Sequence, residues 1–246
     1  MTNPASAAPE PLVSVVIPTY NEAENIAMLA PRVLAALGET HAEVLVVDDA
    51  SPDGTAGVVE ALEAVDPRVR LVRRELKSGL SGAVFAGATQ ARGRYVAVMD
   101  ADLSHDPEEL PSMLACAQEG FDVVVGSRYV PGSAFLHQPL TRRVISRVMN
   151  QGARMLLGLR TRDVLTGYAL CTREALAGMP THHSAGGFKW LVELLATRRG
   201  LRVCEWPIVF QERQAGLSKA TAREALTFTL LCLRLVPWRL RARRAR

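Results

Sequence analysis

The chain has 246 residues, of which 48% are hydrophobic but only 5% aromatic, so an α/β domain of this size would build its core from aliphatic side chains. The formal net charge is +4, and the basic excess after Leu201 predicts an anionic partner, either lipid headgroups or nucleic acid. The four cysteines are too widely spaced for a structural zinc site and are expected to be reduced thiols of a cytosolic protein.

Residues 1–11 are rich in alanine, proline and serine and lack the features of a signal peptide, so we expect a disordered leader. Five apolar runs predict buried strands: 13–17, stopped by Pro18, then 44–47, 70–72, 95–99 and 123–125. Helices are expected after Asn21, after the turn at 51–54, over 79–93 and from Asp106. Apolar strands that alternate with helices predict a mostly parallel sheet covered on both faces.

Polar clusters follow three of these strands, at 18–20, 48–49 and 100–102. The carboxyl ends of parallel strands share one edge of the sheet, which is where such folds bind ligands. Asp100 and Asp102 are two carboxylates at the end of a buried strand, where they would repel each other and resist desolvation. A divalent cation that carries a diphosphate would resolve both problems, so the cluster predicts a nucleotide-diphosphate donor.

The second half of the chain has a different character. Residues 141–159 predict an amphipathic helix whose polar surface is rich in arginine. A capping box at 221–224 opens a last helix, whose apolar part over 225–236 is shorter than the roughly 20 residues that span a bilayer. An interfacial membrane helix and a helix docked on a partner both remain open for this segment, which ends in an arginine-rich tail.

Several motifs make the chain resemble an inverting family of GT-A glycosyltransferases, family 2. The motifs specific to the broad family are 16–22, 46–55 and 100–108. Matches at 126–130, at 145–147 with Asn150, and at 213–219 make it most similar to the dolichyl- or polyprenyl-phosphate mannose synthases. The resemblance implies a GT-A domain over 12–220 and a membrane- or partner-associated segment over 221–246.

The resemblance also implies roles for individual residues. The nucleoside would be held by Pro18, Tyr20, Glu22, Val47 and Asp49, with Ala101 against the nucleotide. Mg²⁺ or Mn²⁺ would be bound by Asp100 and Asp102, and Ser104 stands where some relatives place a further ligand. The acceptor phosphate would be held by Arg128, Arg142, Ser146 and the neighbouring Arg147. A loop carrying Arg213 and Lys219 would close on the donor diphosphate, and the catalytic set would be Asp100, Asp102, Arg128 and Arg213.

The reaction that the resemblance implies is inverting transfer of mannose from GDP-mannose to a polyprenyl (dolichyl) monophosphate. The second pKa of such a phosphate is about 6, so its oxyanion forms at neutral pH without a general base. Two alternatives stay open: a glucosyl- or N-acetylglucosaminyltransferase that uses a UDP-sugar, and a non-catalytic nucleotide-binding membrane adaptor.

The expected location is the cytoplasmic face of a membrane, without a full transmembrane span. The appended transmembrane helices of many relatives have no counterpart in this sequence. A membrane-bound partner subunit is compatible with this reading. Nucleic acid is not expected, because no reading motif accompanies the basic tail.

Overall fold

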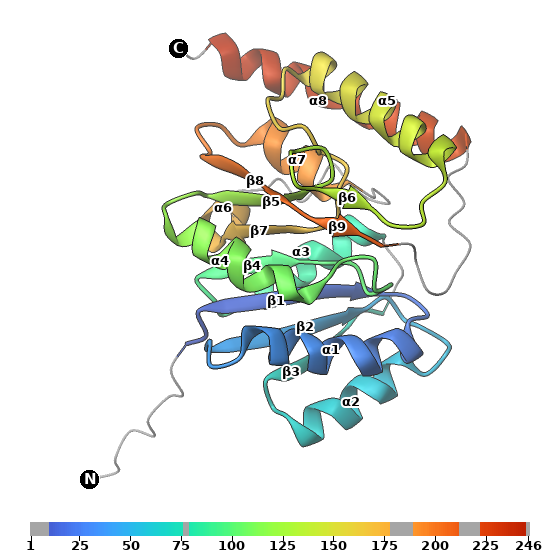
Figure 1. Cartoon of the computed structure of the whole chain (residues 1–246), viewed down its shortest axis with the longest axis vertical. Coiled ribbons are helices and arrows are strands. Elements are labelled where there is room, and N and C mark those ends of the chain that lie inside the picture. Colours follow the sequence, from blue (N-terminus) through green and yellow to red (C-terminus); the bar gives the residue numbers. More distant parts are fainter. Residues whose placement is uncertain (1–9, 76–78, 178–188, 212–221, 245–246) are drawn as a thin grey trace.

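The computed structural model describes residues 10–75, 79–177, 189–211 and 222–244, and a seven-stranded sheet runs through its centre (Figure 1). Five strands match the predicted runs: β1 (Val13–Thr19), β2 (Ala42–Asp48), β3 (Val69–Arg73), β4 (Tyr95–Val98) and β5 (Val123–Ser127). Two were not predicted: β7 (Ala169–Thr172) and β8 (Val203–Pro207). The order is β3-β2-β1-β4-β7-β5-β8, and only β7 is antiparallel to its neighbours, which confirms a mostly parallel sheet.

Helices cover both faces of this sheet. One face carries α1 (Ala23–Leu37), α2 (Thr55–Val65) and α4 (Leu110–Gln118). The other carries α3 (Leu80–Gln90), α5 (Leu140–Leu157), α6 (Arg173–Ala177), α7 (Trp190–Thr197) and α8 (Ala222–Arg244). Val15 and Ile17 of β1 pack on the α1 side, while Val16 packs on the α3 side. Burial on both faces explains why the strands are continuous apolar runs rather than alternating ones.

The first strand does not stop at Pro18 as predicted but continues to Thr19. The Val16 carbonyl accepts from Met99 on the β4 side, whereas the Thr19 carbonyl accepts from Asp49 on the β2 side. By this alternation the backbone nitrogen of Pro18 faces β4, whose pairing with β1 ends at Val16. No ladder hydrogen bond is lost there, so proline is compatible with the strand.

The helix predicted over 79–93 ends earlier, at Gln90. Gly93 lies against β1, where an added Cβ would come within 2.6 Å of the Ser14 backbone nitrogen. The predicted start at Asp106 is confirmed, because its carboxylate accepts from the Glu108 N–H at 3.2 Å. That cap opens a short 3-10 turn, η1 (Pro107–Glu109), before α4 begins.

The last helix, α8, does not end before Pro237 but runs through it to Arg244. Proline removes a hydrogen bond to the carbonyl four residues earlier, that of Leu233, whose side chain is on the exposed side of the helix. Water can satisfy a carbonyl on that side. Thr221 of the predicted capping box is outside the described residues. Among the described helices, none has both the length and the apolar character to cross a membrane.

Figure 1 shows α5 and α8 side by side, forming an outer layer at the top of the molecule. The buried side of α8 carries residues at helical spacing: Phe228, Leu231, Cys232 and Leu235. The opposite faces of both helices are apolar and exposed. Val148 is 66% and Met155 74% exposed on α5, and Leu233 is 52% exposed on α8. The layer therefore presents an apolar surface to the outside.

Candidate active site

Three loops lie at the carboxyl edge of the sheet, after β1, β2 and β4. The first two are joined by hydrogen bonds of 3.1 Å, from the Asp49 N–H to the Thr19 carbonyl and from the Glu22 N–H to the Thr55 hydroxyl. Each loop contains a non-glycine residue with positive φ: Asn21, Ala50 and Leu103. Such a backbone costs about 1–2 kcal/mol per residue and is typical of ligand-binding loops. The loops therefore have the strain expected of a binding edge.

The residues predicted to hold the nucleoside all come from the ends of β1 and β2 and from the loops that follow them: Pro18, Tyr20, Glu22, Val47 and Asp49. Tyr20 is exposed at the edge, whereas the Val47 side chain is buried in the core on the α3 side. Asp49 is buried and forms an ion pair with Arg74, which sequence analysis missed. The charge of Arg74 holds the Asp49 carboxylate at the edge of the sheet.

Asp100 and Asp102 lie in the loop that follows β4. The Asp100 side chain is partly exposed, while Asp102 is buried and accepts from both the N–H and the hydroxyl of Ser104, at 3.1 and 2.6 Å. Ser104 therefore orients Asp102 in this structure, and its role as a further metal ligand stays a prediction. Ala101, between the two acids, is buried among the side chains below the loop.

Two further residues fix Asp100. The Asp100 N–H donates to His105 Nδ1 at 3.2 Å, and the His105 ring stacks on Tyr168 with centroids 4.9 Å apart. Burial lowers the pKa of His105, against the opposing effect of Asp100 and Asp102, so the ring is a neutral acceptor. Gly167 lies under the Asp100 carboxylate, where an added Cβ would come within 2.7 Å of both oxygens. Only glycine leaves room for this carboxylate.

Arg128, predicted to hold the acceptor phosphate, directly follows β5 and is held by Asp163. Its Nε and Nη2 donate to the two Asp163 carboxylate oxygens at 2.7 and 2.9 Å, and its backbone N–H donates at 3.0 Å. Asp163 has 0% exposure. Burial alone would lower the pKa of Arg128, but the Asp163 charge and hydrogen bonds raise it, so the guanidinium stays charged. Nη1 is its only nitrogen without a partner among the described residues.

An aromatic cluster, which the sequence did not predict, connects the acids to α5. Phe210, on β9 (Val209–Phe210), has its ring centroid 5.7 Å from His105 and 6.3 Å from Phe135, on β6 (Ala134–Phe135). The guanidinium of Arg128 lies 5.1 Å from the Phe210 centroid. Arg147 lies 5.6 Å from the ring of Tyr129. Aromatic faces attract guanidinium groups, so the cluster positions cations on the acceptor side.

The other residues predicted to bind the acceptor are on the first half of α5. Ser146 accepts from the Tyr129 hydroxyl at 2.9 Å, which brings it beside the aromatic cluster. Arg142 is four residues earlier and therefore on the same helix face. The structure thus brings Arg128, Ser146 and Arg147 together. The predicted loop residues Arg213 and Lys219 lie outside the described residues.

The sequence matches the family Glycosyl transferase family 2 over residues 14–178. A polyprenol monophosphomannose synthase from Mycolicibacterium smegmatis is 39% identical over 98% of this chain and 92% of its own length. An undecaprenyl-phosphate mannosyltransferase from Micrococcus luteus is 40% identical over 84% of this chain and 86% of its own length. A dolichol-phosphate mannosyltransferase from Pyrococcus furiosus is 36% identical over 92% of this chain and 64% of its own length.

The chain therefore belongs to glycosyl transferase family 2 and is a glycosyltransferase, which contradicts the hypothesis of a non-catalytic adaptor. A crystal structure of glucosyl-3-phosphoglycerate synthase from Mycobacterium tuberculosis, in complex with Mn²⁺, UDP and glucosyl-3-phosphoglycerate, has a TM-score of 0.66. It is 19% identical and covers 92% of this chain and 80% of that one. This likeness confirms the predicted GT-A fold.

Proposed function

We propose that the chain transfers mannose from GDP-mannose to a polyprenyl monophosphate, with inversion at the sugar carbon. The names of three relatives between 36% and 40% identical support mannose as the sugar and a polyprenyl phosphate as the acceptor, and GDP-mannose as the donor is part of the proposal. The structural observation that carries the proposal is the pairing of two unlike half-sites. Carboxylates occupy the end of β4, and guanidinium groups held on aromatic rings occupy the adjoining side toward α5.

The acceptor half suits a phosphate monoester. Arg128 cannot swing away, because its Nε and Nη2 are fixed on Asp163, and it presents Nη1 to a ligand. Ser146 and Arg147 add a hydroxyl and a second cation from α5. A polyprenyl phosphate held there is already an oxyanion at neutral pH, so these residues need only orient it for in-line attack. The attacking phosphate oxygen forms the new bond to the sugar carbon as the bond to the donor diphosphate breaks.

The donor half suits a divalent cation with a diphosphate. Two carboxylates with hard oxygen atoms would hold Mg²⁺ or Mn²⁺ while leaving positions for phosphate oxygens and water. Among the described residues no third acidic, histidine or cysteine side chain completes a metal cage, which fits a cation shared with the donor. The cation would neutralise the departing diphosphate. Ser104 and His105 hold Asp102 and Asp100 in place, and Arg213 and Lys219 are proposed to close over the diphosphate.

The enzyme is also proposed to lie on the cytoplasmic face of a membrane, with α5 and α8 against the lipid. Their exposed faces carry arginine beside large apolar side chains. The apolar ones are Leu140, Val144, Val148 and Met155 on α5 and Leu226, Leu230, Leu233 and Trp238 on α8. Helices of this kind bind at the boundary between headgroups and acyl chains. The acceptor half-site begins at the same helix, α5, so a lipid phosphate would reach it from the membrane surface.

The test is transfer of radiolabelled mannose from GDP-mannose into the organic phase, with Mg²⁺ or Mn²⁺ and polyprenyl phosphate. Asp102→Asn should lower kcat by about 100-fold or more, because a metal supplies several kcal/mol of charge stabilisation. The matched control is Asp66→Asn, which removes a partly exposed carboxylate at the end of α2 and should leave kcat unchanged. Absence of lipid-linked label from the wild-type protein would contradict the proposal.

The UDP-sugar alternative is decided by ligand-dependent thermal stability. A nucleotide that binds only the folded protein raises Tm in proportion to its occupancy. With metal present, GDP should raise Tm at lower concentration than UDP. A larger effect of UDP would replace GDP-mannose with a UDP-sugar and leave the acceptor assignment standing.

A further inference from the structure

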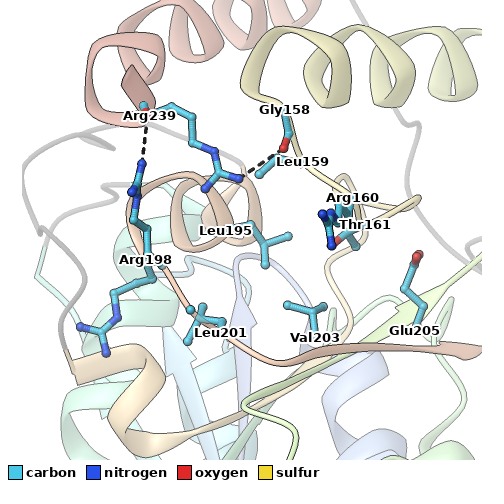
Figure 2. Close-up of a pocket in the computed structure, with 12 residues that line it drawn as sticks. Gly158, Leu159, Arg160, Thr161, Leu195, Arg198, Leu201, Val203, Glu205 and Arg239 are labelled. Carbon is cyan, nitrogen blue, oxygen red and sulfur yellow. Dashed lines mark hydrogen bonds between the residues drawn. The ribbon is translucent and has the colours of Figure 1, made fainter. Parts of the chain in front are cut away.

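A cavity of about 780 Å³ lies at the far end of α5 from the predicted acceptor residues, beneath the C-terminal part of α8 (Figure 2). Its wall comes from the segment after α5, the segment between α7 and β8, and α8. Four arginines line it: Arg160, Arg198, Arg199 and Arg239. The floor is apolar, with Leu195, Leu201 and Val203 in the view of Figure 2. A cavity of this size is within the range of small-molecule sites.

The arginines differ in how much of their binding capacity the fold uses. Arg239 belongs to the fold, because its Nε and Nη2 donate to the carbonyls of Leu157 and Gly158 at 2.9 and 3.2 Å and so cap α5. Nη2 of Arg199 donates to the Arg239 carbonyl at 3.3 Å. Arg160 is exposed and has no hydrogen bond to any described residue. Donors on Arg160 and Arg199 therefore remain for a ligand.

The described residues do not balance the positive charge of the cavity. Glu205 is the one carboxylate in the wall, and it already accepts from the N–H groups of Arg162 and Asp163 at 2.9 and 3.1 Å. Neither Arg160 nor Arg199 forms an ion pair within the part of the chain that the structure describes. Guanidinium groups bind phosphate oxygens bidentately and are preferred for that purpose. The arginines can therefore bind an anion, and the apolar floor can contact the group that carries it.

We infer that this cavity binds the phosphodiester headgroup of an anionic glycerophospholipid, at a site separate from the acceptor site. The location identifies the source of the phosphate. Trp238, which is exposed, directly precedes Arg239, and Met155 lies one turn before Gly158. The cavity therefore borders the exposed apolar layer of α5 and α8, where a headgroup could enter while its acyl chains stay in the lipid. This step rests on the proposed membrane orientation of that layer.

The test is calorimetric titration of the full chain with dihexanoyl phosphatidylglycerol, a water-soluble lipid, and separately with inorganic phosphate. The wild-type protein should bind one lipid per chain. Arg160→Gln with Arg199→Gln should weaken binding by roughly 25-fold, at about 5-fold for each arginine removed. The matched control, Arg92→Gln with Arg94→Gln, removes two charges between α3 and β4 and should bind as the wild type does.

Equal binding by both double variants, or no saturable binding, would overturn the inference. So would inorganic phosphate that binds as tightly as the lipid, since this identifies a free-anion site. The mannosyl-transfer assay in detergent separates this inference from the proposed function. Arg160→Gln with Arg199→Gln should retain wild-type transfer, because neither residue is in either half of the active site. If transfer fails in the wild type while lipid binding holds, only the proposed function is refuted.

Discussion

The ion pair between Arg128 and Asp163 gives the sharpest prediction. Asp163 has 0% exposure and accepts three hydrogen bonds from Arg128. Asp163→Asn preserves the shape but leaves a buried cation without its counter-charge, which costs about 3–5 kcal/mol. In a chain of this length each kcal/mol lowers Tm by about 2–4 °C, so Tm should fall by about 6–20 °C.

The assay is thermal unfolding at neutral pH, compared with Asp66→Asn. Asp66 pairs with Arg68 at 2.7 Å on the surface, where such a pair contributes no more than about 1 kcal/mol. A double variant, Arg128→Met with Asp163→Leu, separates charge from packing. Removing the whole pair should restore most of the lost Tm, because apolar residues of similar volume replace a buried pair without net cost.

Mannosyl transfer by these variants is measured at a temperature at which all of them are folded. Both Asp163→Asn and the double variant should have a much lower kcat, since Arg128 is misplaced in one and absent in the other. An Asp163→Asn variant that unfolds within about 2 °C of the wild type would contradict this prediction, because a loss of 1 kcal/mol alone lowers Tm by about that much. A double variant as unstable as the single one would contradict it too.

Three further predictions concern other parts of the molecule. Gly167→Ala should lower kcat by about 10–100-fold, because its Cβ would displace the Asp100 carboxylate, whereas Gly152→Ala on α5, which has open space, should leave kcat unchanged and Tm equal or higher. EDTA should abolish transfer and added Mg²⁺ or Mn²⁺ restore it, and full activity in EDTA would refute the metal role. Burial alone would raise the pKa of Glu43, but hydrogen bonds from Ser14, Arg92 and Arg70 lower it below 4.5. The Glu43 carboxylate therefore stabilises the folded state above pH 4.5, and this stabilisation is lost as the pH falls below that value. Glu43→Gln should flatten that acid loss of Tm.

The sequence predicted those features that depend on residues close together in the chain. The five apolar runs became β1 to β5, because hydrophobic patterning is a property of neighbouring residues. The acids that follow these strands lie at one edge of the sheet, because the strands are parallel. Strand β7 was not predicted, since its four residues follow a loop and carry little periodicity. Its place between β4 and β5 comes from tertiary pairing alone.

The partners that hold residues of the candidate active site were missed for the same reason. Arg128 and Asp163 are 35 residues apart in the chain, and Asp49 and Arg74 are 25 apart. Sequence patterns at helix or strand spacing carry no signal for such pairs. Two of these missed partners lie in one short segment, 163–169. That segment supplies both the counter-charge of Arg128 and the glycine beneath Asp100.

The position of Asp163 has a consequence for how the two half-sites coexist. The negative charge of Asp100 contributes to the raised pKa of Arg128, so the two side chains are close enough to attract each other. An Arg128 side chain released from Asp163 would turn toward Asp100 and neutralise a carboxylate that the proposed donor metal needs. Asp163 prevents this by holding Nε and Nη2 in a fixed bidentate geometry. Asp163→Asn should therefore weaken metal binding as well as acceptor binding, and a raised Mn²⁺ requirement in that variant would distinguish this role from a purely structural one.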